Sequence, residues 1–302
     1  MTQPTHPVQQ AQATATPQHQ LSALESAMRG VNVLLMGATG TGKTHSIGTL
    51  VDSGVEVFYL GLENGIESLI GYWTDKNLPV PKNLHWAQAM GSSAGFAEQL
   101  EMAKQVNTLS FEALAKMTDP NRSKYDQGRR LLTLLNNFID ERTGQSFGPV
   151  DKWDTDKCLV IDGLSGINQA AMTNAVGAKV AKGMHEWGMA QAFIINLVER
   201  LTNGCACHFV LLAHTERETD QVMGGVKLMP ATLGKAISSS FAPKFSDVVL
   251  TERQGDKWTW STANPLADLK TRNLPISNTI QPTFAPILQK WKARKAAMQA
   301  VH

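Results

Sequence analysis

The chain has 302 residues, of which 42% are hydrophobic and 18% are charged, and its formal net charge at pH 7 is +2. This composition is that of an ordinary folded protein, and the nearly neutral charge excludes a globally basic surface, so any nucleic-acid site would be a local patch. Three cysteines and no recognisable signal peptide predict a reducing, cytoplasmic location, and no apolar run is long enough to predict a membrane span.

The N-terminal part of the chain changes character near residue 21. Residues 1–20 are rich in Gln, Thr, Pro and Ala, which predicts a disordered tail, and residues 21–302 are expected to form one folded domain. In that domain we expect a short helix at 21–30 that ends at a glycine, and a buried strand at 31–37. We then expect a helix at 44–54 and a second strand at 55–65.

The remaining elements continue the same alternation. Residues 66–151 predict a largely helical insertion, with a possible short strand at 86–90. A third buried strand is expected at 157–167, a helical region up to residue 203, and a fourth strand at 207–218. A hairpin is expected from 245–253 and 257–263, and a basic helix closes the C-terminal segment 276–302. Apolar strands alternating with helices predict an α/β fold of three layers with a mostly parallel sheet.

A phosphate-binding loop follows the first strand. The sequence GATGTGKT matches G-x-x-x-x-G-K-[ST] without a mismatch, and it lies between a predicted strand and a predicted helix. Glycines let the backbone curl so that its N–H groups point at phosphate oxygens, Lys43 would contact the terminal phosphates, and Thr44 would bind Mg²⁺. The nucleotide-binding residues are therefore Gly37, Ala38, Thr39, Gly40, Thr41, Gly42, Lys43 and Thr44.

Two acids end neighbouring strands of the predicted sheet. Asp162 closes an apolar run and is expected to help hold Mg²⁺; the alternative is a turn-forming Asp before Gly163. Glu63 ends the second strand, where a carboxylate could orient and deprotonate an attacking water. A strand-end histidine, His214, closes the LLAH segment of the fourth strand.

The order of the phosphate loop, Glu63, Asp162 and the strand ending in His214 resembles the RecA-like branch of P-loop ATPases. Within that branch the sequence is most similar to small phage-type RecA-like single-strand annealing and recombination ATPases. The resemblance implies a P-loop NTPase fold with ATP and Mg²⁺ as ligands. It also implies that Glu63 activates water and that His214 senses the terminal phosphate; the alternative for His214 is a histidine satisfied by the backbone.

The resemblance also covers the segment LKTRNLP. Ring-forming RecA-like enzymes use a Lys-x-Arg pair to reach the nucleotide of the next subunit, which implies catalytic roles for Lys270 and Arg272 and a homo-oligomer, either ring or filament. Two cations two residues apart on an extended strand point the same way, so both could reach one triphosphate. The alternative is a pair of solvated cations.

Single-stranded DNA is the partner that the resemblance implies. The loops expected to face DNA contain Lys179 and Lys182, and then Arg217, Lys227 and Lys235, while the C-terminal helix carries a further basic run, 290–295. Solvated lysines are the alternative interpretation. The sequence thus indicates an ATPase acting on single-stranded DNA in recombination or annealing. The alternatives are a ring helicase or loader-like replication ATPase, and a nucleotide-gated assembly or regulatory protein.

Overall fold

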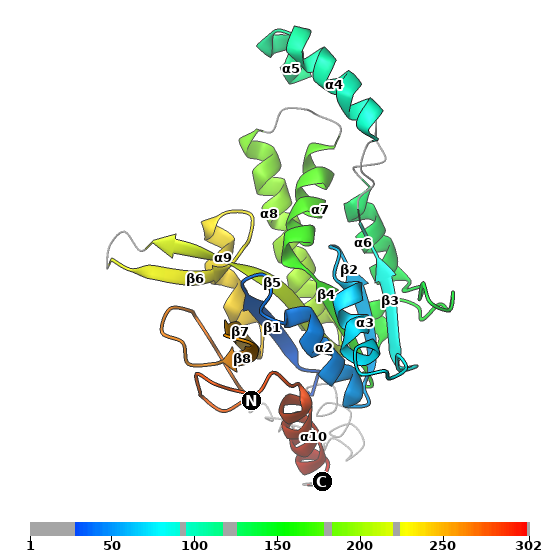
Figure 1. Ribbon diagram of the computed structural model, residues 1–302, viewed down its shortest axis with the longest axis vertical. Coiled ribbons are helices and arrows are strands. Elements are labelled where there is room, and N and C mark those ends of the chain that lie inside the picture. The colour runs from blue at the N-terminus through cyan, green and yellow to red at the C-terminus, as the bar shows by residue number, and fades with distance from the viewer. Residues whose placement is uncertain (1–27, 91–94, 117–125, 178–182, 220–223, 301–302) are drawn as a thin grey trace, which may run out of the picture.

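The computed structural model describes residues 28–90, 95–116, 126–177, 183–219 and 224–300. Its centre is an eight-stranded sheet with the order β3-β2-β4-β5-β1-β7-β8, and β6 pairs with β5 outside this path (Figure 1). All pairings are parallel except β5–β6 and β7–β8. The strands are β1 Asn32–Gly37, β2 Glu56–Gly61, β3 Leu84–Gln88, β4 Lys157–Asp162, β5 His208–Thr219, β6 Val226–Pro230, β7 Asp247–Gln254 and β8 Lys257–Ser261.

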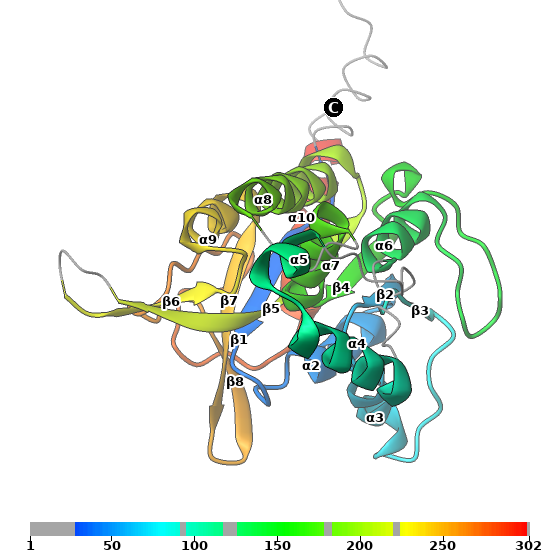
Figure 2. The same cartoon turned by 90° about the horizontal axis from the view of Figure 1, so that it is seen from above.

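Helices cover both faces of the sheet, which gives three layers (Figure 2). Alternate residues of each strand point to opposite faces, so the sheet forms two separate cores. One core joins the strands to α6, α7, α8 and α9, and the other joins them to α2, α3 and α10. The helices are α2 Lys43–Asp52, α3 Ile66–Thr74, α4 Phe96–Thr108, α5 Phe111–Lys116, α6 Gln127–Asn136, α7 Leu164–Val176, α8 Met184–Glu199, α9 Lys235–Phe241 and α10 Ala285–Ala300.

The predicted α/β architecture is confirmed, with the C-terminal hairpin formed by β7 and β8 and the closing helix by α10. The expected tail and most of the helix at 21–30 lie outside the described residues. No helix within the described part of the chain combines the length and the apolar character that a membrane crossing requires.

Several boundaries differ from the sequence expectations. The strand expected at 55–65 ends at Gly61, and the one expected at 157–167 ends at Asp162, where α7 follows after a single residue. The fourth strand, expected at 207–218, is β5, but the loop expected after it contains β6, which pairs with β5 in a hairpin that extends away from the sheet (Figures 1 and 2). Backbone pairing across this hairpin satisfies hydrogen-bonding groups that the loop interpretation left to solvent.

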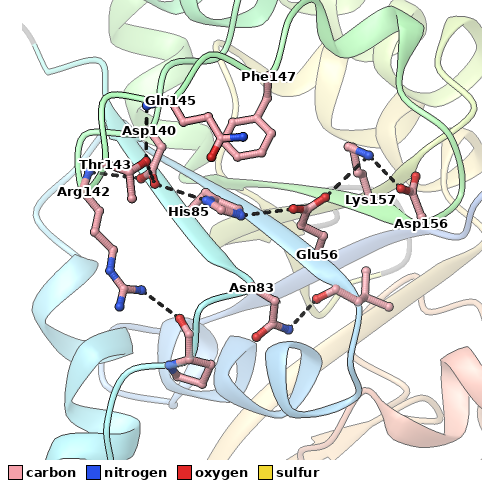
Figure 3. Close-up of polar contacts among 12 residues, drawn as sticks. Glu56, Asn83, His85, Asp140, Arg142, Thr143, Gln145, Phe147, Asp156 and Lys157 are labelled. Atoms are coloured by element: carbon pink, nitrogen blue, oxygen red, sulfur yellow. Dashed lines mark hydrogen bonds and ion pairs between the residues drawn. The ribbon is translucent and has the colours of Figure 1, made fainter.

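The 66–151 region is more than a helical insertion. Its strand β3 pairs with β2 along five residues and forms an edge of the main sheet, whereas α4 has no buried residue and lies apart from the sheet (Figure 1). The β3 edge is fixed by the fully buried Asp140, whose carboxylate accepts hydrogen bonds from Thr143 Oγ1 (Figure 3) and from the backbone N–H of Trp86. His85 bridges this acid to Glu56 of β2, with ring nitrogens 3.1 and 3.3 Å from the two carboxylates.

Candidate functional site

The phosphate loop joins β1 to α2 at the carboxyl end of the parallel strands. Gly40 and Gly42 adopt φ of 78° and 79°, a left-handed conformation that residues with a side chain rarely adopt. Thr41 ties the loop down, since its hydroxyl donates to Ala38 O at 2.8 Å and lies 2.6 Å from the hydroxyl of Thr251 on β7. The N-terminus of α2 therefore faces the curl of the loop, which is the arrangement that binds phosphate.

Lys43 lies inside the loop it belongs to. Its ammonium group donates to the carbonyl oxygens of Gly37 and Ala38, both at 2.9 Å, and its side chain is buried. Burial lowers the pKa of Lys43, while the nearby charges of Asp162 and Glu63 act in the opposite direction. A cation held here by loop carbonyls can exchange them for phosphate oxygens without leaving its place.

Thr44 and Asp162 meet beside the loop. The Thr44 hydroxyl donates to Asp162 Oδ2 at 2.7 Å, and the Tyr59 hydroxyl donates to the same oxygen at 2.8 Å. Burial raises the pKa of Asp162, and these two hydrogen bonds partly offset the effect. A hydroxyl and a carboxylate are hard oxygen donors of the kind and number that Mg²⁺ takes beside the phosphates of a nucleotide, so these residues fit that metal.

Glu63 lies two residues beyond the end of β2, next to the histidine that ends the apolar part of β5. Its Oε1 accepts the backbone N–H of Gly166 at 3.0 Å, and its Oε2 lies 3.6 Å from Nε2 of His214. The His214 ring lowers the pKa of Glu63, an effect that partial burial opposes. The carboxylate is therefore held in its charged form at the mouth of the sheet.

These groups share one pocket of about 700 Å³. Its lining includes the phosphate loop from Thr39 to Thr44 together with Glu63, Asp162 and His214. The structure thus brings the three residues predicted at strand ends together with most of the predicted loop, whereas the Lys-x-Arg pair lies elsewhere.

A second pocket of about 680 Å³ lies along α2 and is also lined by residues of α3, β8 and α10. Trp258 of β8 lines both pockets, and its indole N–H donates to Gly40 O at 3.1 Å. The ring of His45 packs 4.8 Å from Trp258 and 5.0 Å from Tyr72, measured between ring centroids. An aromatic cluster therefore borders the loop at Gly40 and Gly42.

Lys270 and Arg272 lie outside this site. The backbone of Lys270 forms a β-bridge with Val248 near the start of β7, whereas the phosphate loop lies beside Thr251, three residues further along the same strand. The Lys270–Arg272 pair is therefore about 10 Å or more along the sheet from the phosphate loop of the same chain. The expected extended strand is wrong: only Lys270 makes a strand-like bridge, and the Arg272 backbone N–H donates to Asp247 Oδ1 in a turn. The buried carboxylate of Asp247 organises that turn, since it also accepts from Asn273 and Thr271.

The basic residues proposed to face DNA are spread over several elements. Lys179 and Lys182 lie outside the described residues, and the backbone of Lys235 begins α9. Arg217 is exposed on the β5 extension, and Lys227 on β6 forms an ion pair with Asp268 at 2.7 Å. On α10, Lys295 donates to Thr155 and Arg294 donates to Asn273, so part of that basic run binds the body of the protein.

Sequence reasoning missed Tyr59, Tyr72 and Trp258. Tyr59 was hidden in an apolar run that reads only as a buried strand, and its polar hydroxyl in that run was the available signal. Trp258 belongs to a hairpin far along the chain, and no spacing in the sequence links it to the loop.

No family model matches the sequence, and no curated protein matches it. Among solved structures, the chain is similar to an ATPase from the type III secretion system of pathogenic bacteria (11% identity, TM-score 0.35, covering 74% of this chain and 53% of that one). It is also similar to the flagellar accessory protein FlaH from Methanocaldococcus jannaschii (10% identity, TM-score 0.35, covering 85% and 88%).

A third similar structure is the assembled ATPase EscN, in complex with its central stalk EscO, from the type III secretion system of enteropathogenic E. coli (10% identity, TM-score 0.36, covering 89% and 53%). The chain spans about half the length of the two secretion ATPases. The strand order and the helices that cover both faces of the sheet define the α/β fold of this chain.

Proposed function

We propose that the chain binds a nucleoside triphosphate, ATP in the first instance, together with Mg²⁺ and hydrolyses its terminal phosphoanhydride bond. One observation carries this activity: a phosphate loop with its lysine, a hydroxyl and carboxylate pair, and a separate carboxylate at a strand end all line one pocket. Phosphoryl transfer needs little else, because its catalysis is mostly positioning and charge stabilisation.

Each group then has a defined task. Lys43 places its positive charge at the terminal phosphates, and Thr44 and Asp162 hold Mg²⁺, which neutralises phosphate charge when bound. Glu63 is held by the Gly166 N–H and by His214, so it can orient the attacking water and accept its proton. The contact between His214 and Glu63 supports the role of His214 as a sensor of the terminal phosphate.

The second pocket, called the aromatic pocket from here on, favours a nucleotide over a bare polyphosphate as the ligand. It opens beside Gly42 and His45, where a chain of phosphates leaving the loop would continue, and it is lined by Trp258 and Tyr72. Aromatic side chains stack on bases whatever the base, so this pocket would hold the nucleoside without selecting adenine by itself.

We further propose single-stranded DNA as the partner and a shared, oligomeric site. Strand β5 runs without interruption from His214 into the β5–β6 hairpin, so a shift at the phosphate sensor would reach Arg217 through one continuous strand. Because Lys270 and Arg272 are far from their own loop, they could act only on the nucleotide of a neighbouring subunit. A ring helicase or loader, and a slowly cycling assembly protein, are the competing functions.

ATP turnover titrated with single-stranded DNA, with oligomer mass measured in parallel, tests these functions. Turnover that needs Mg²⁺ and rises with single-stranded DNA supports the proposal, and strand-annealing against strand-displacement assays separate annealing from helicase action. Mg²⁺-dependent turnover that does not change with single-stranded DNA favours the assembly-protein function. No turnover or nucleotide binding would overturn the activity itself.

A further inference from the structure

We infer that Tyr59 is a positioning residue that holds the Asp162 carboxylate in the orientation that binds Mg²⁺; this rests on the proposed Mg²⁺-dependent nucleotide binding. Tyr59 is fully buried in the middle of β2. Its hydroxyl donates to Asp162 Oδ2 at 2.8 Å, and the Thr44 hydroxyl donates to that same oxygen at 2.7 Å. Two donors on one oxygen fix the rotation of the carboxylate group.

The sheet register explains how a side chain from the neighbouring strand reaches this acid. In the β2–β4 pairing, Gly61 lies opposite Asp162, and Tyr59 lies opposite Val160, two residues earlier. Residues two apart on a strand share a face, so Tyr59, Gly61 and Asp162 lie on one face of the sheet. A Cβ at Gly61 would lie 3.2 Å from Cε1 of Tyr59, so the glycine leaves the space through which the Tyr59 ring extends toward Asp162.

A second glycine makes room for the hydrogen bond itself. A Cβ at Gly65 would lie 2.6 Å from the Tyr59 hydroxyl oxygen and 2.8 Å from Asp162 Oδ2. Contacts this short do not occur in folded proteins, so any side chain at position 65 would displace one of the two groups. Because Gly61 and Gly65 have no side chains, they leave the space that the Tyr59 and Asp162 side chains occupy where they meet.

The energetics favour a role beyond filling the core. A buried phenol hydroxyl needs a hydrogen-bond partner, and a backbone carbonyl would serve that need. Here the partner is instead the acid that meets the Thr44 hydroxyl beside the phosphate loop. Removal of a group that hydrogen-bonds to a metal ligand and orients it typically lowers metal affinity by about 10- to 100-fold.

The test is Tyr59→Phe, which removes one oxygen and keeps the ring. ADP affinity is measured by calorimetry with Mg²⁺ and again with EDTA, and Mn²⁺ bound in the presence of ADP is counted by electron paramagnetic resonance. We expect the Mg²⁺-dependent gain in ADP affinity to fall about 10-fold or more, with ADP affinity in EDTA unchanged. The Mn²⁺ affinity should fall in the same ratio.

Thr143→Val is the matched control. It also removes a hydroxyl that donates to a buried carboxylate, Asp140, at 2.7 Å, but on the β3 edge outside the nucleotide pocket (Figure 3). We expect it to lower the melting temperature without changing the Mg²⁺ dependence. Gly65→Ala gives a second route, since its methyl group would displace the Tyr59–Asp162 contact, and it should weaken Mg²⁺-dependent ADP binding as well.

The outcomes separate this inference from the proposed function. If the ADP affinity of the wild-type protein is the same with Mg²⁺ and with EDTA, the proposed function is wrong. A wild-type protein that responds to Mg²⁺, with a folded Tyr59→Phe variant that responds equally, overturns the role of Tyr59. If the Tyr59→Phe variant loses ADP affinity equally in EDTA and in Mg²⁺, the role of Tyr59 is also overturned, because that pattern would mean that the pocket has collapsed. If Tyr59→Phe does not fold, Gly65→Ala decides by the same criteria.

Discussion

The imidazole of His214 lies 3.6 Å from the carboxylate of Glu63, and the two residues come from strands that are separated in the sheet by β4. Their contact spans the mouth of the nucleotide pocket and joins the candidate water-activating acid to the strand that continues into the β5–β6 hairpin.

This contact predicts a pH dependence. Because His214 lowers the pKa of Glu63 below its ordinary value of 4.5, the carboxylate should stay charged at pH values where a solvated glutamate is half protonated. The pKa that Glu63 contributes to the acidic limb of the pH–rate profile should therefore be higher in His214→Ala than in the wild type. Overlapping limbs in the two proteins would contradict the coupling.

Removal of the loop lysine should abolish turnover. Lys43→Ala takes away the one side-chain cation that lies among the described residues of the phosphate pocket, and loss of a single charge-stabilising donor costs at least about 100-fold in rate. Asp162→Asn should instead raise the Mg²⁺ concentration needed for half-maximal turnover. The control is Lys104→Ala on α4, whose ammonium pairs with Glu101 away from the site and whose loss should leave turnover unchanged.

The aromatic pocket predicts a difference between nucleotide and polyphosphate. Trp258→Ala should weaken ADP binding about 10-fold, since base stacking contributes about 1–3 kcal/mol, while binding of inorganic tripolyphosphate stays the same. Calorimetry with both ligands measures this. Trp187→Ala, which removes a partly exposed tryptophan of α8, should change neither affinity. Equal weakening of both ligands by Trp258→Ala would show that the ring supports only the loop.

The Lys-x-Arg pair predicts complementation between subunits. Arg272→Ala should bind ATP normally but hydrolyse it poorly, because the guanidinium would stabilise charge only in the transition state. A mixture with Lys43→Ala subunits should recover part of the lost turnover, since some interfaces would combine an intact loop with an intact arginine. A mixture no more active than its separate components would remove Arg272 from the site.

The β3 edge predicts acid-sensitive stability. Burial alone would raise the pKa of Asp140, but hydrogen bonds from Thr143, His85 and two backbone N–H groups outweigh it and hold the pKa below 3.8. A lowered pKa stabilises the fold above the unfolded-state value and loses that contribution as pH falls through the folded one. Asp140→Ala should cost about 3 kcal/mol in urea unfolding at pH 7 and progressively less below pH 4.

Part of the site could be predicted because its signal is local. The phosphate loop is one unbroken stretch of eight residues, and its left-handed glycines and buried lysine follow from that stretch alone. Glu63 and Asp162 could be found because each lies at the carboxyl end of an apolar strand, and parallel strands end at the same edge of a sheet. The sequence by itself therefore determined the fold class and which residues of the loop and of the strand ends line the pocket.

The tertiary structure decided the rest of the site. Tyr59 reaches Asp162 only through the β2–β4 register, and Trp258 reaches Gly40 across 218 positions of chain only because β7 pairs with β1. The tertiary structure also paired the end of β5 with β6 in a hairpin and placed Lys270 and Arg272 far from their own loop. Local patterns set which residues point inward, but strand order and register set which distant side chains meet, because those depend on packing of the whole chain.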